Sequence, residues 1–276
     1  MPKIKVQNLT LNYEQQGSGE PLILIPYLTA DHACYAFQVP EYAKYFTCIS
    51  VDLRGTGESD NSPAAYSTEL LADDIAGFMQ VLGLQAAHVS GVSLGSAVGT
   101  WLAAKHPAKV KSLSLHSSWP KTDLFVKTVV EGWQTMAKAL PSVAEMTIRG
   151  IFPWCFTPEL YATKPEYIQS LADFVRGRPA QSLASFIQQS DAVITHDAEG
   201  QLGKITAPTQ ITFGRFDQVT STRFADRLKH GIRHSELLVF EGCSHAPLYE
   251  KVEEFNGKTL QFLQRYATAA PRAAAV

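Results

Sequence analysis

The chain of 276 residues is long enough for one large domain or two small ones, and its 45% hydrophobic and 18% charged residues are typical of a globular protein. Twenty-four basic and 26 acidic side chains give a net charge of −2 without a run of like charge, which argues against a nucleic-acid partner or a polybasic membrane patch. The longest apolar run, PLILIPYL, is far shorter than the ~20 residues of a membrane span. The first residues contain no apolar signal segment, so we expect a cytoplasmic protein that acts on a small molecule.

The cysteine residues are also consistent with a cytoplasmic protein. Cys34, Cys48, Cys155 and Cys243 are widely scattered, which predicts free thiols. The chain contains neither a C-x-x-C pair nor a His/Cys cluster, so we expect no metal site, and no motif implies a cofactor. The sequence leaves the oligomeric state open.

Strand-like segments recur in chain order: ILI after Pro21, FTCISVDL, AAHVSGV, VKSLSLH, TQITFG and SELLVFEG. Such near-continuous apolar strands are typical of a parallel sheet that is buried on both faces. Helical patterns lie between them. In residues 68–83, for example, apolar side chains recur at helical spacing and Gly83 marks the end. The alternation predicts an α/β fold with a doubly wound, mostly parallel sheet.

The strand pattern is interrupted between residues 119 and 203 by long helical stretches and a proline-marked aromatic loop. We interpret residues 119–203 as a helical cap that is inserted after the sixth strand and covers one end of the sheet. The core domain is then formed by residues 1–118 and 204–268. Aromatic side chains concentrate in the insert, so Trp119 and Trp154 are candidates for a substrate pocket. Residues 269–276 carry no amphipathic pattern and are predicted to be a flexible tail.

The stretch HVSGVSLGSAVG contains a serine between two glycines, where a strand pattern gives way to a helical one. In G-x-S-x-G the flanking glycines, Gly91 and Gly95, permit a sharp turn that exposes the hydroxyl of Ser93 at the end of the strand. A helix that starts behind the serine adds a positive dipole end where negative charge would develop. The alternative is that these small residues only permit a tight turn between strand and helix.

A nucleophilic serine needs a histidine as base and an acid that orients the histidine. TQITFGRFDQVT places Asp217 in the loop beyond a late strand, and SELLVFEGCSHAPLYE places His245 in the loop beyond the next strand. His116 is the main competitor, because it ends the strand VKSLSLH and would face the same crevice, where it could touch substrate. His88 and His106 lie in a strand and at a helix end, positions that favour structural roles.

With these residues in order, the chain resembles the α/β-hydrolase superfamily over nearly its whole length. Ser93, Asp217 and His245 follow the superfamily's order of nucleophile, acid and histidine. The segment VDLRGTGESD, residues 51–60, resembles its D-x-R-G-x-G-x-S loop, which we interpret as structural, and the insert resembles its cap domain. The resemblance therefore implies an α/β-hydrolase fold.

One segment departs from the superfamily pattern. Members usually carry His-Gly-x after the strand that precedes the first helix, whereas this chain has Pro26, Tyr27 and Leu28. Because the oxyanion donor is a main-chain group, we expect the oxyanion hole to use the N–H groups of Leu28 and Leu94. Tyr27 occupies the glycine place, so a strained backbone is expected there, and its hydroxyl is a candidate donor to substrate.

These residues predict acyl transfer to water. His245 would take the proton of Ser93, Asp217 would orient the imidazole, and the oxyanion donors would bind the tetrahedral intermediate. The aromatic insert favours a small to medium, mainly apolar ester or lactone. Two alternatives within the superfamily stay open: a hydrolase of carbon–carbon bonds in ring-cleavage products, and a ligand-sensing receptor with very slow turnover. The altered Pro26–Tyr27 turn is the feature that favours the receptor.

Overall fold

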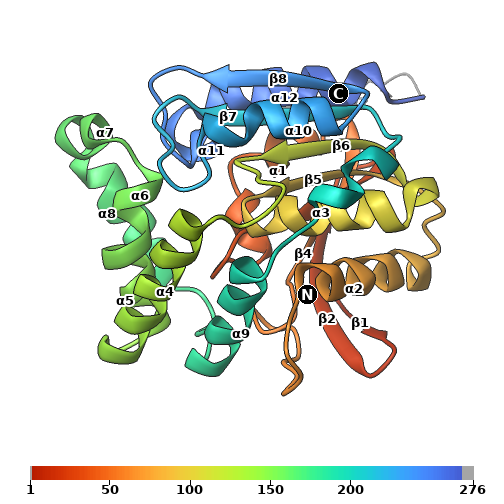
Figure 1. Cartoon of the computed structure of the whole chain (residues 1–276). Helices are drawn as coiled ribbons and strands as arrows, with labels where there is room; N and C mark the ends of the chain where they lie inside the picture. The colour runs from red at the N-terminus through yellow and green to blue at the C-terminus, as the bar shows by residue number, and fades with distance from the viewer. Residues whose placement is uncertain (1, 269–276) are drawn as a thin grey trace.

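Eight strands form one sheet in the order β1-β2-β4-β3-β5-β6-β7-β8 in the computed structural model, which describes residues 2–268 (Figure 1). The neighbours from β4 through β8 pair in parallel, whereas β1–β2 and β2–β4 pair antiparallel. The doubly wound, mostly parallel sheet predicted from the sequence is therefore confirmed. The predicted tail, residues 269–276, lies outside the described residues. The strands are β1 (Lys3–Val6), β2 (Leu9–Gln16), β3 (Glu20–Ile25), β4 (Phe46–Val51), β5 (Ala87–Val92), β6 (Val110–His116), β7 (Thr209–Gly214) and β8 (Ser235–Phe240).

Alternation along the strands divides the apolar side chains between the two faces of the sheet. In β3, Ile23 and Ile25 join one hydrophobic cluster, and Leu22 and Leu24 join the other. Helices α2, α3 and α10 supply the first cluster, and α1, α11 and α12 supply the second. The core helices are η1 (His32–Tyr35), α1 (Val39–Tyr42), α2 (Thr68–Val81), α3 (Leu94–Lys105), η2 (Pro107–Lys109), η5 (Thr222–Phe224), α10 (Ala225–Gly231), α11 (Pro247–Glu250) and α12 (Val252–Arg265).

The chain between β6 and β7 is helical and lies beside the carboxyl ends of the strands, as Figure 1 shows in green. Asp123, Ser142, Thr157 and Ser182 each precede a helix of this segment and accept a backbone N–H with their side chains, which fixes where those helices begin. The elements are α4 (Leu124–Ala139), α5 (Val143–Met146), η3 (Thr147–Ile151), α6 (Phe152–Cys155), α7 (Pro158–Thr163), α8 (Pro165–Arg176), α9 (Leu183–Ile194) and η4 (Glu199–Lys204).

The loop after β4 is held by buried polar contacts. Asp52 accepts the backbone N–H groups of His32 and Glu58 and the side-chain amide of Asn12. Arg54 forms a two-pronged ion pair with Asp74 of α2. These contacts join the loop after β4 to β2 and α2, which agrees with a structural role for the loop.

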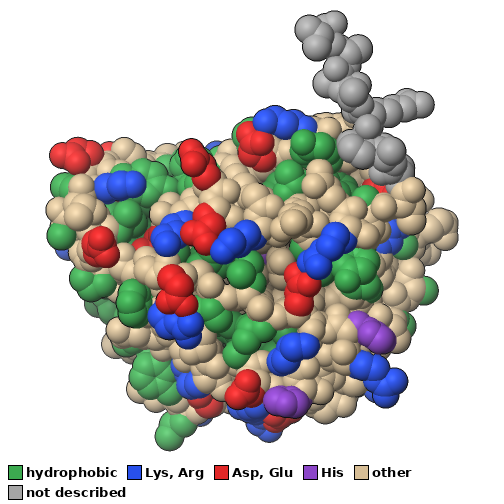
Figure 2. Space-filling view, turned by 90° about the horizontal axis from the view of Figure 1, so that it is seen from above, with side chains coloured by type: hydrophobic (Ala, Val, Ile, Leu, Met, Phe, Trp, Pro, Cys, Tyr) green, Lys and Arg blue, Asp and Glu red, His purple; other side chains and the backbone are tan. Residues whose placement is uncertain are grey.

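On the face seen in Figure 2, basic and acidic side chains are interspersed. Among residues 2–268, no helix is both long and apolar enough to cross a membrane.

Candidate active site

Ser93 lies in a strained turn between β5 and α3. Its backbone has φ 51° and ψ −117°, on the left-handed side that side chains with a Cβ seldom adopt. The backbone N–H of Ser93 donates to the carbonyl of His116 at 2.9 Å, and its own carbonyl accepts from Ser96 and Ala97 as α3 begins. The turn therefore lifts the Ser93 hydroxyl out of the strand and into a cavity that it lines.

The two glycines of the motif are required by crowding. A Cβ on Gly95 would lie 2.1 Å from the carbonyl oxygen of Ile25, and a Cβ on Gly91 would lie 2.2 Å from the carbonyl oxygen of Gly95. Both distances are far below van der Waals contact, so only glycine permits β3, β5 and α3 to approach this closely. The approach brings the end of β3, which leads into Leu28, up to the turn that carries Ser93.

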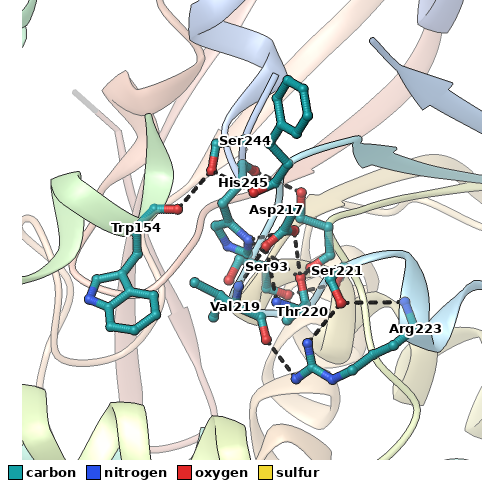
Figure 3. A network of polar contacts seen from close by, with 12 residues as sticks. Ser93, Trp154, Asp217, Val219, Thr220, Ser221, Arg223, Ser244 and His245 are labelled. Atoms are coloured by element: carbon teal, nitrogen blue, oxygen red, sulfur yellow. Dashed lines mark hydrogen bonds and ion pairs between the residues drawn. The ribbon is translucent and has the colours of Figure 1, made fainter. Parts of the chain in front are cut away.

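Asp217 and His245 meet at the ends of β7 and β8. His245 Nδ1 lies 2.9 Å from Asp217 Oδ2, and the ring is seen beside Asp217 with Ser93 nearby in Figure 3. Asp217 Oδ1 accepts the backbone N–H groups of Val219 and Thr220 at 2.8 and 3.1 Å. Burial by itself would raise the pKa of the Asp217 carboxyl, but the His245 ring and the Thr220 donors outweigh it and hold that pKa below its usual value. Asp217 is therefore ionised and can fix the imidazole.

The loops that hold the acid and the histidine pack against each other through a glycine. A Cβ on Gly214, at the end of β7, would lie 1.8 Å from the carbonyl oxygen of Ser244. The backbone of Phe216 also donates to the carbonyl of Cys243 at 2.8 Å. The close contact fixes the distance between the segments that carry Asp217 and His245.

His245 and Ser93 both line the cavity. Among residues 2–268, no hydrogen bond joins the Ser93 hydroxyl to the His245 ring. Contacts between a nucleophile and its base are commonly loose without substrate and tighten when it binds, so this geometry is compatible with the predicted pair.

The turn after β6 contacts all three segments of the triad. The carbonyl of His116 accepts from the backbone of Ser93, and the hydroxyl of Ser117 donates to the carbonyl of His245 at 2.7 Å. The carbonyl of Ser117 lies 3.0 Å from the hydroxyl of Thr220, which also lies 3.0 Å from Asp217 Oδ2. Ser117 itself has φ 51°. Neither Ser117 nor Thr220 was predicted from the sequence. Thr220 carried a detectable signal, a hydroxyl residue three positions after the acid in a loop.

The expectation that the His116 side chain reaches the substrate crevice is wrong. Its ring nitrogens lie 3.1 Å from Ser90 Oγ and 2.8 Å from Thr212 Oγ1, and its edge packs on Phe255 of α12. Side chains alternate along a strand, and this one points toward α12 and away from the cavity. Burial lowers the pKa of His116 to about 3, so the ring is neutral.

The cavity wall opposite the sheet comes from the helical segment and is apolar. Trp119 and Trp133 line it, but their indole N–H groups already donate to Thr122 and to the carbonyl of Gly150. They therefore offer the cavity only their apolar surfaces. Further lining residues from this segment are Val126, Val130, Thr147, Ile151, Phe152, Cys155, Phe156, Leu171, Phe174, Val175 and Val193.

Trp154 does not line this cavity, which corrects the expectation from the sequence. Phe152, Cys155 and Phe156 face the cavity from positions three and four apart, so a side chain two positions after Phe152 lies on another side of the helix. The Trp154 ring instead packs edge-on against Phe125, and only its backbone carbonyl contacts the histidine loop, through Ser244 Oγ (Figure 3).

A half-buried carboxylate, that of Glu250, fastens the helical segment to the histidine loop. Glu250 accepts the backbone N–H of Ser244 through one oxygen and both the N–H and hydroxyl of Thr157 through the other. The N–H of Ala246 donates to the carbonyl of Cys155. Burial raises the pKa of Glu250 above its usual value. These contacts set the position of the apolar wall relative to His245.

Tyr27 lines the cavity, but its backbone is not in the left-handed region, so the strain expected there is absent. Thr29 has φ 72° instead, in a turn closed by the N–H of Ala30 and the carbonyl of Tyr27. The hydroxyls of Tyr27 and Tyr249 are 2.8 Å apart, and Tyr249 gives its one proton to the carbonyl of Cys34. Tyr27 must therefore donate to Tyr249, which leaves its oxygen only as an acceptor for a ligand.

A family model described as "alpha/beta hydrolase fold" matches residues 20–252. The chain belongs to the α/β-hydrolase family. It is 29% identical to the AB hydrolase superfamily protein YisY of Bacillus subtilis, over 93% of this chain and 96% of the relative. It is 24% identical to 3-oxoadipate enol-lactonase 2 of Acinetobacter baylyi, over 95% and 96% of the two chains.

Two further similarities concern reaction type and fold. The chain is 25% identical to a 2-hydroxy-6-oxo-6-phenylhexa-2,4-dienoate hydrolase of Comamonas testosteroni, over 94% of this chain and 93% of the relative. The solved structure of an enol-lactonase from Burkholderia xenovorans superposes with a TM-score of 0.85 at 21% identity, covering 95% and 100% of the two chains. The superposition bears on the fold alone.

In this α/β-hydrolase, two backbone donors remain for an oxyanion. The N–H groups of Leu28 and Leu94 donate to no other described residue. Leu94 is the first residue of α3, where helix N–H groups lack a partner within the helix. Leu28 lines the cavity together with Ser93. The altered Pro26–Tyr27 sequence therefore leaves the Leu28 donor available.

One cluster of this α/β-hydrolase has the residue types of a metal site. One ligand atom from each of Asp31, His32 and Asp52 lies within 4.8 Å of the others, and all three residues are buried. Asp52 Oδ1 is bonded to His32, however, and the two oxygens of Asp31 accept from Ala33 and Arg178. Burial would lower the pKa of His32, but its bond to Asp52 raises it. The cluster therefore works as an internal ion pair whose ligand atoms are already engaged.

Proposed function

We propose that this α/β-hydrolase is a serine hydrolase that cleaves a carboxylic ester or lactone of a small to medium, mainly apolar molecule. One observation carries the proposal: Ser93, His245 and Leu28 line one apolar cavity. Asp217 is bonded to His245 behind it, and the vacant amides are those of Leu28 and of Leu94, the residue after Ser93. Acyl transfer needs this set of groups, a nucleophile, an oriented base and oxyanion donors.

In the proposed reaction His245 Nε2 takes the proton of Ser93 as Oγ attacks the carbonyl carbon. The negative oxygen of the tetrahedral intermediate accepts from the amides of Leu28 and Leu94, and each such donor is typically worth about 3 kcal/mol at the transition state. The imidazolium then gives its proton to the departing alcohol oxygen. Water repeats the cycle on the acyl-enzyme. Because its pKa is held low, Asp217 stays ionised and stabilises the imidazolium throughout.

Carbon–carbon bond hydrolysis is the second candidate, supported by the relative that is named for it. The same serine, histidine and oxyanion donors would serve it, so only substrates separate the two reactions. The ligand-sensing receptor with very slow turnover has less support, because the backbone strain expected at Tyr27 is absent.

The test is hydrolysis of 4-nitrophenyl acetate, butyrate and octanoate by the wild type, by Ser93→Ala and by Ser170→Ala, an exposed serine of α8. We expect turnover by the wild type and Ser170→Ala and its loss in Ser93→Ala. Equal rates in all three proteins would overturn the serine mechanism. If the wild type does not hydrolyse the 4-nitrophenyl esters but cleaves a ring-fission product, and Ser93→Ala does not cleave that product, the carbon–carbon reaction is favoured.

A further inference from the structure

A second cavity adjoins the apolar one. The two share Tyr27, Thr147, Phe174 and Val175, and their volumes are about 70 Å³ for the apolar cavity and 290 Å³ for the second. The second cavity continues past the Tyr27–Leu28 turn along Thr29, Ala30 and Asp31 on the core side. From the helical segment it is lined by residues 142–144, Arg176 and residues 178–181, so Arg176 and Arg178 both line it. Its lining is therefore more polar than the apolar wall above Ser93.

Arg178 is distinguished among the arginines near the site by how its donors are used. Arg149 and Arg215 line neither cavity and pair with Glu145 and Glu241 at the surface. Arg176 lines the second cavity but is engaged by two carboxylates, Glu145 and Asp173.

Arg178 instead uses only Nε, which donates to Asp31 at 2.8 Å. Its terminal nitrogens have no acceptor among the described residues. The guanidinium is also held in place, because its carbon lies 5.7 Å from the centre of the Phe174 ring and Asp31 is buried. A planar pair of vacant N–H groups, fixed in orientation, matches the two oxygens of a carboxylate.

The position of Arg178 relative to the oxyanion donor limits what can reach it. Asp31 follows Leu28 by three residues, so their Cα atoms are at most about 11 Å apart. An acyl chain of roughly four to eight carbons spans distances of this order, so its ester carbonyl at Leu28 and a carboxylate at Arg178 are compatible in length.

The position of His245 decides whether the acyl part or the alcohol part of the ester enters the second cavity. The departing oxygen must lie within hydrogen-bond reach of the histidine, which lines the apolar cavity and not the second one. The acyl chain is then the part that extends past Tyr27.

We propose that the second cavity binds a carboxylate at the far end of the acyl group, held by the terminal nitrogens of Arg178. The substrates would then be half-esters, or lactones with a carboxylate, of medium-length dicarboxylic acids. The proposal rests on the proposed ester hydrolysis for its chemistry, but the binding site itself can be tested without turnover.

The first experiment compares two pairs of substrates: the 4-nitrophenyl half-esters of adipic and suberic acid, and the neutral 4-nitrophenyl hexanoate and octanoate. In the wild type we expect higher kcat/KM for each half-ester relative to its neutral partner. Arg178→Met should lower that ratio by roughly 10- to 100-fold, mainly through KM, because a charge-assisted two-pronged contact is lost. Arg178→Lys, which keeps the charge, should lower that ratio by less than Arg178→Met does. Arg149→Met removes the same charge outside the cavities and should leave the ratio unchanged.

A structural role of Arg178 in holding Asp31 would give a different result. Damage to the turn beside Leu28 would lower kcat for half-esters and neutral esters alike and leave their ratio unchanged, which would overturn the proposal. An equal fall of the ratio in Arg149→Met would also overturn it, because the effect would then be long-range charge alone.

A second experiment separates this proposal from the proposed function. Calorimetry measures binding of suberate and octanoate to Ser93→Ala with and without Arg178→Met. Suberate binding that requires Arg178 supports the carboxylate site even if no ester is hydrolysed. If suberate does not bind, or if it binds equally well with and without Arg178→Met, the proposed carboxylate site is overturned even if neutral esters are cleaved.

Discussion

The two walls of the apolar cavity are built in different ways. The core wall is made of backbone: the turn at Ser93, the amides of Leu28 and Leu94, and the loops after β7 and β8, all held by close glycine contacts and main-chain hydrogen bonds. The wall from the helical segment is made of side chains, whose polar groups are turned away into neighbours. Changes in the first wall should therefore affect catalysis, and changes in the second should affect which substrate fits.

The largest effect is expected for Asp217→Asn. The asparagine cannot stabilise the imidazolium and favours the wrong tautomer of His245, so kcat should fall by about 10⁴-fold with KM little changed. Initial rates on 4-nitrophenyl butyrate measure it, and Asp197→Asn at an exposed site of the helical segment serves as control. A loss below about tenfold would mean that Asp217 does not serve the histidine.

Gly95→Ala tests the backbone wall, and Gly132→Ala in α4 is its matched control. The new Cβ at position 95 meets the Ile25 carbonyl, so the free energy of unfolding should fall by about 3 kcal/mol or more and activity should be lost. At position 132 no atom lies within 4 Å of the new Cβ, and the same change should stabilise the helix by up to about 1 kcal/mol with activity retained. Urea unfolding of both variants, with rates at low denaturant, gives the comparison. Equal tolerance at the two positions would refute the packing argument.

Ser117→Ala removes the hydrogen bond to the carbonyl of His245 without touching substrate. We expect kcat to fall by about tenfold with KM unchanged, since a loosened imidazole reaches the serine less often. If kcat and KM change together, or if neither changes, the residue does not position the histidine.

Val130→Ala changes only the side-chain wall. The buried valine lines the apolar cavity, so its truncation should raise the ratio of kcat/KM for octanoate over acetate by roughly 5-fold while acetate turnover stays within about twofold. Val81→Ala, at an exposed site of α2, is the matched control and should change neither value. A large loss of acetate turnover would show that the two walls are not separable.

The smallest effect concerns pH. Because the pKa of Asp217 lies below its ordinary value of 3.8 in the folded chain, its ionised form stabilises the fold at every pH above that value. The stabilisation is lost as the pH falls through the folded pKa. The difference in free energy of unfolding between wild type and Asp217→Asn should be constant near neutrality and shrink below pH 3.8, by at most about 1.4 kcal/mol per pH unit. Denaturant titrations at several pH values measure it, and a difference that grows on acidification would contradict the assignment.

Much of the fold was readable because its signals are local. The apolar runs of β3 to β8 and the helix beginning at Thr68 were predicted within a few residues, since burial on both faces of a parallel sheet demands continuous apolar strands. The antiparallel strands β1 and β2 were not named, because β2 has no continuous apolar run and ends in polar, exposed residues. Their place depends on partners elsewhere in the chain.

The candidate site also contains residues that local sequence signals predict and residues that depend on tertiary contacts. Ser93, Asp217 and His245 could be named because each follows a strand in a recognisable loop, and the structure brings Asp217 and His245 into contact. His116 and Trp154 were misplaced because the direction of a side chain depends on the exact phase of a strand or helix, which the sequence gives only within a residue or two. Ser117 could not be found, since its contact with His245 joins residues 128 positions apart.

By itself the sequence determined the class of fold and the chemistry of the candidate site, because strand periodicity and the glycine-flanked serine are local properties. Only the tertiary structure decided which side chains line the cavities, that the left-handed backbone near Leu28 lies at Thr29, and that Arg178, among the arginines of residues 2–268, lines a cavity with both terminal nitrogens vacant. The lining of both cavities depends on contacts between distant segments, because the helical segment packs on the strand ends and no one stretch of the chain supplies both walls.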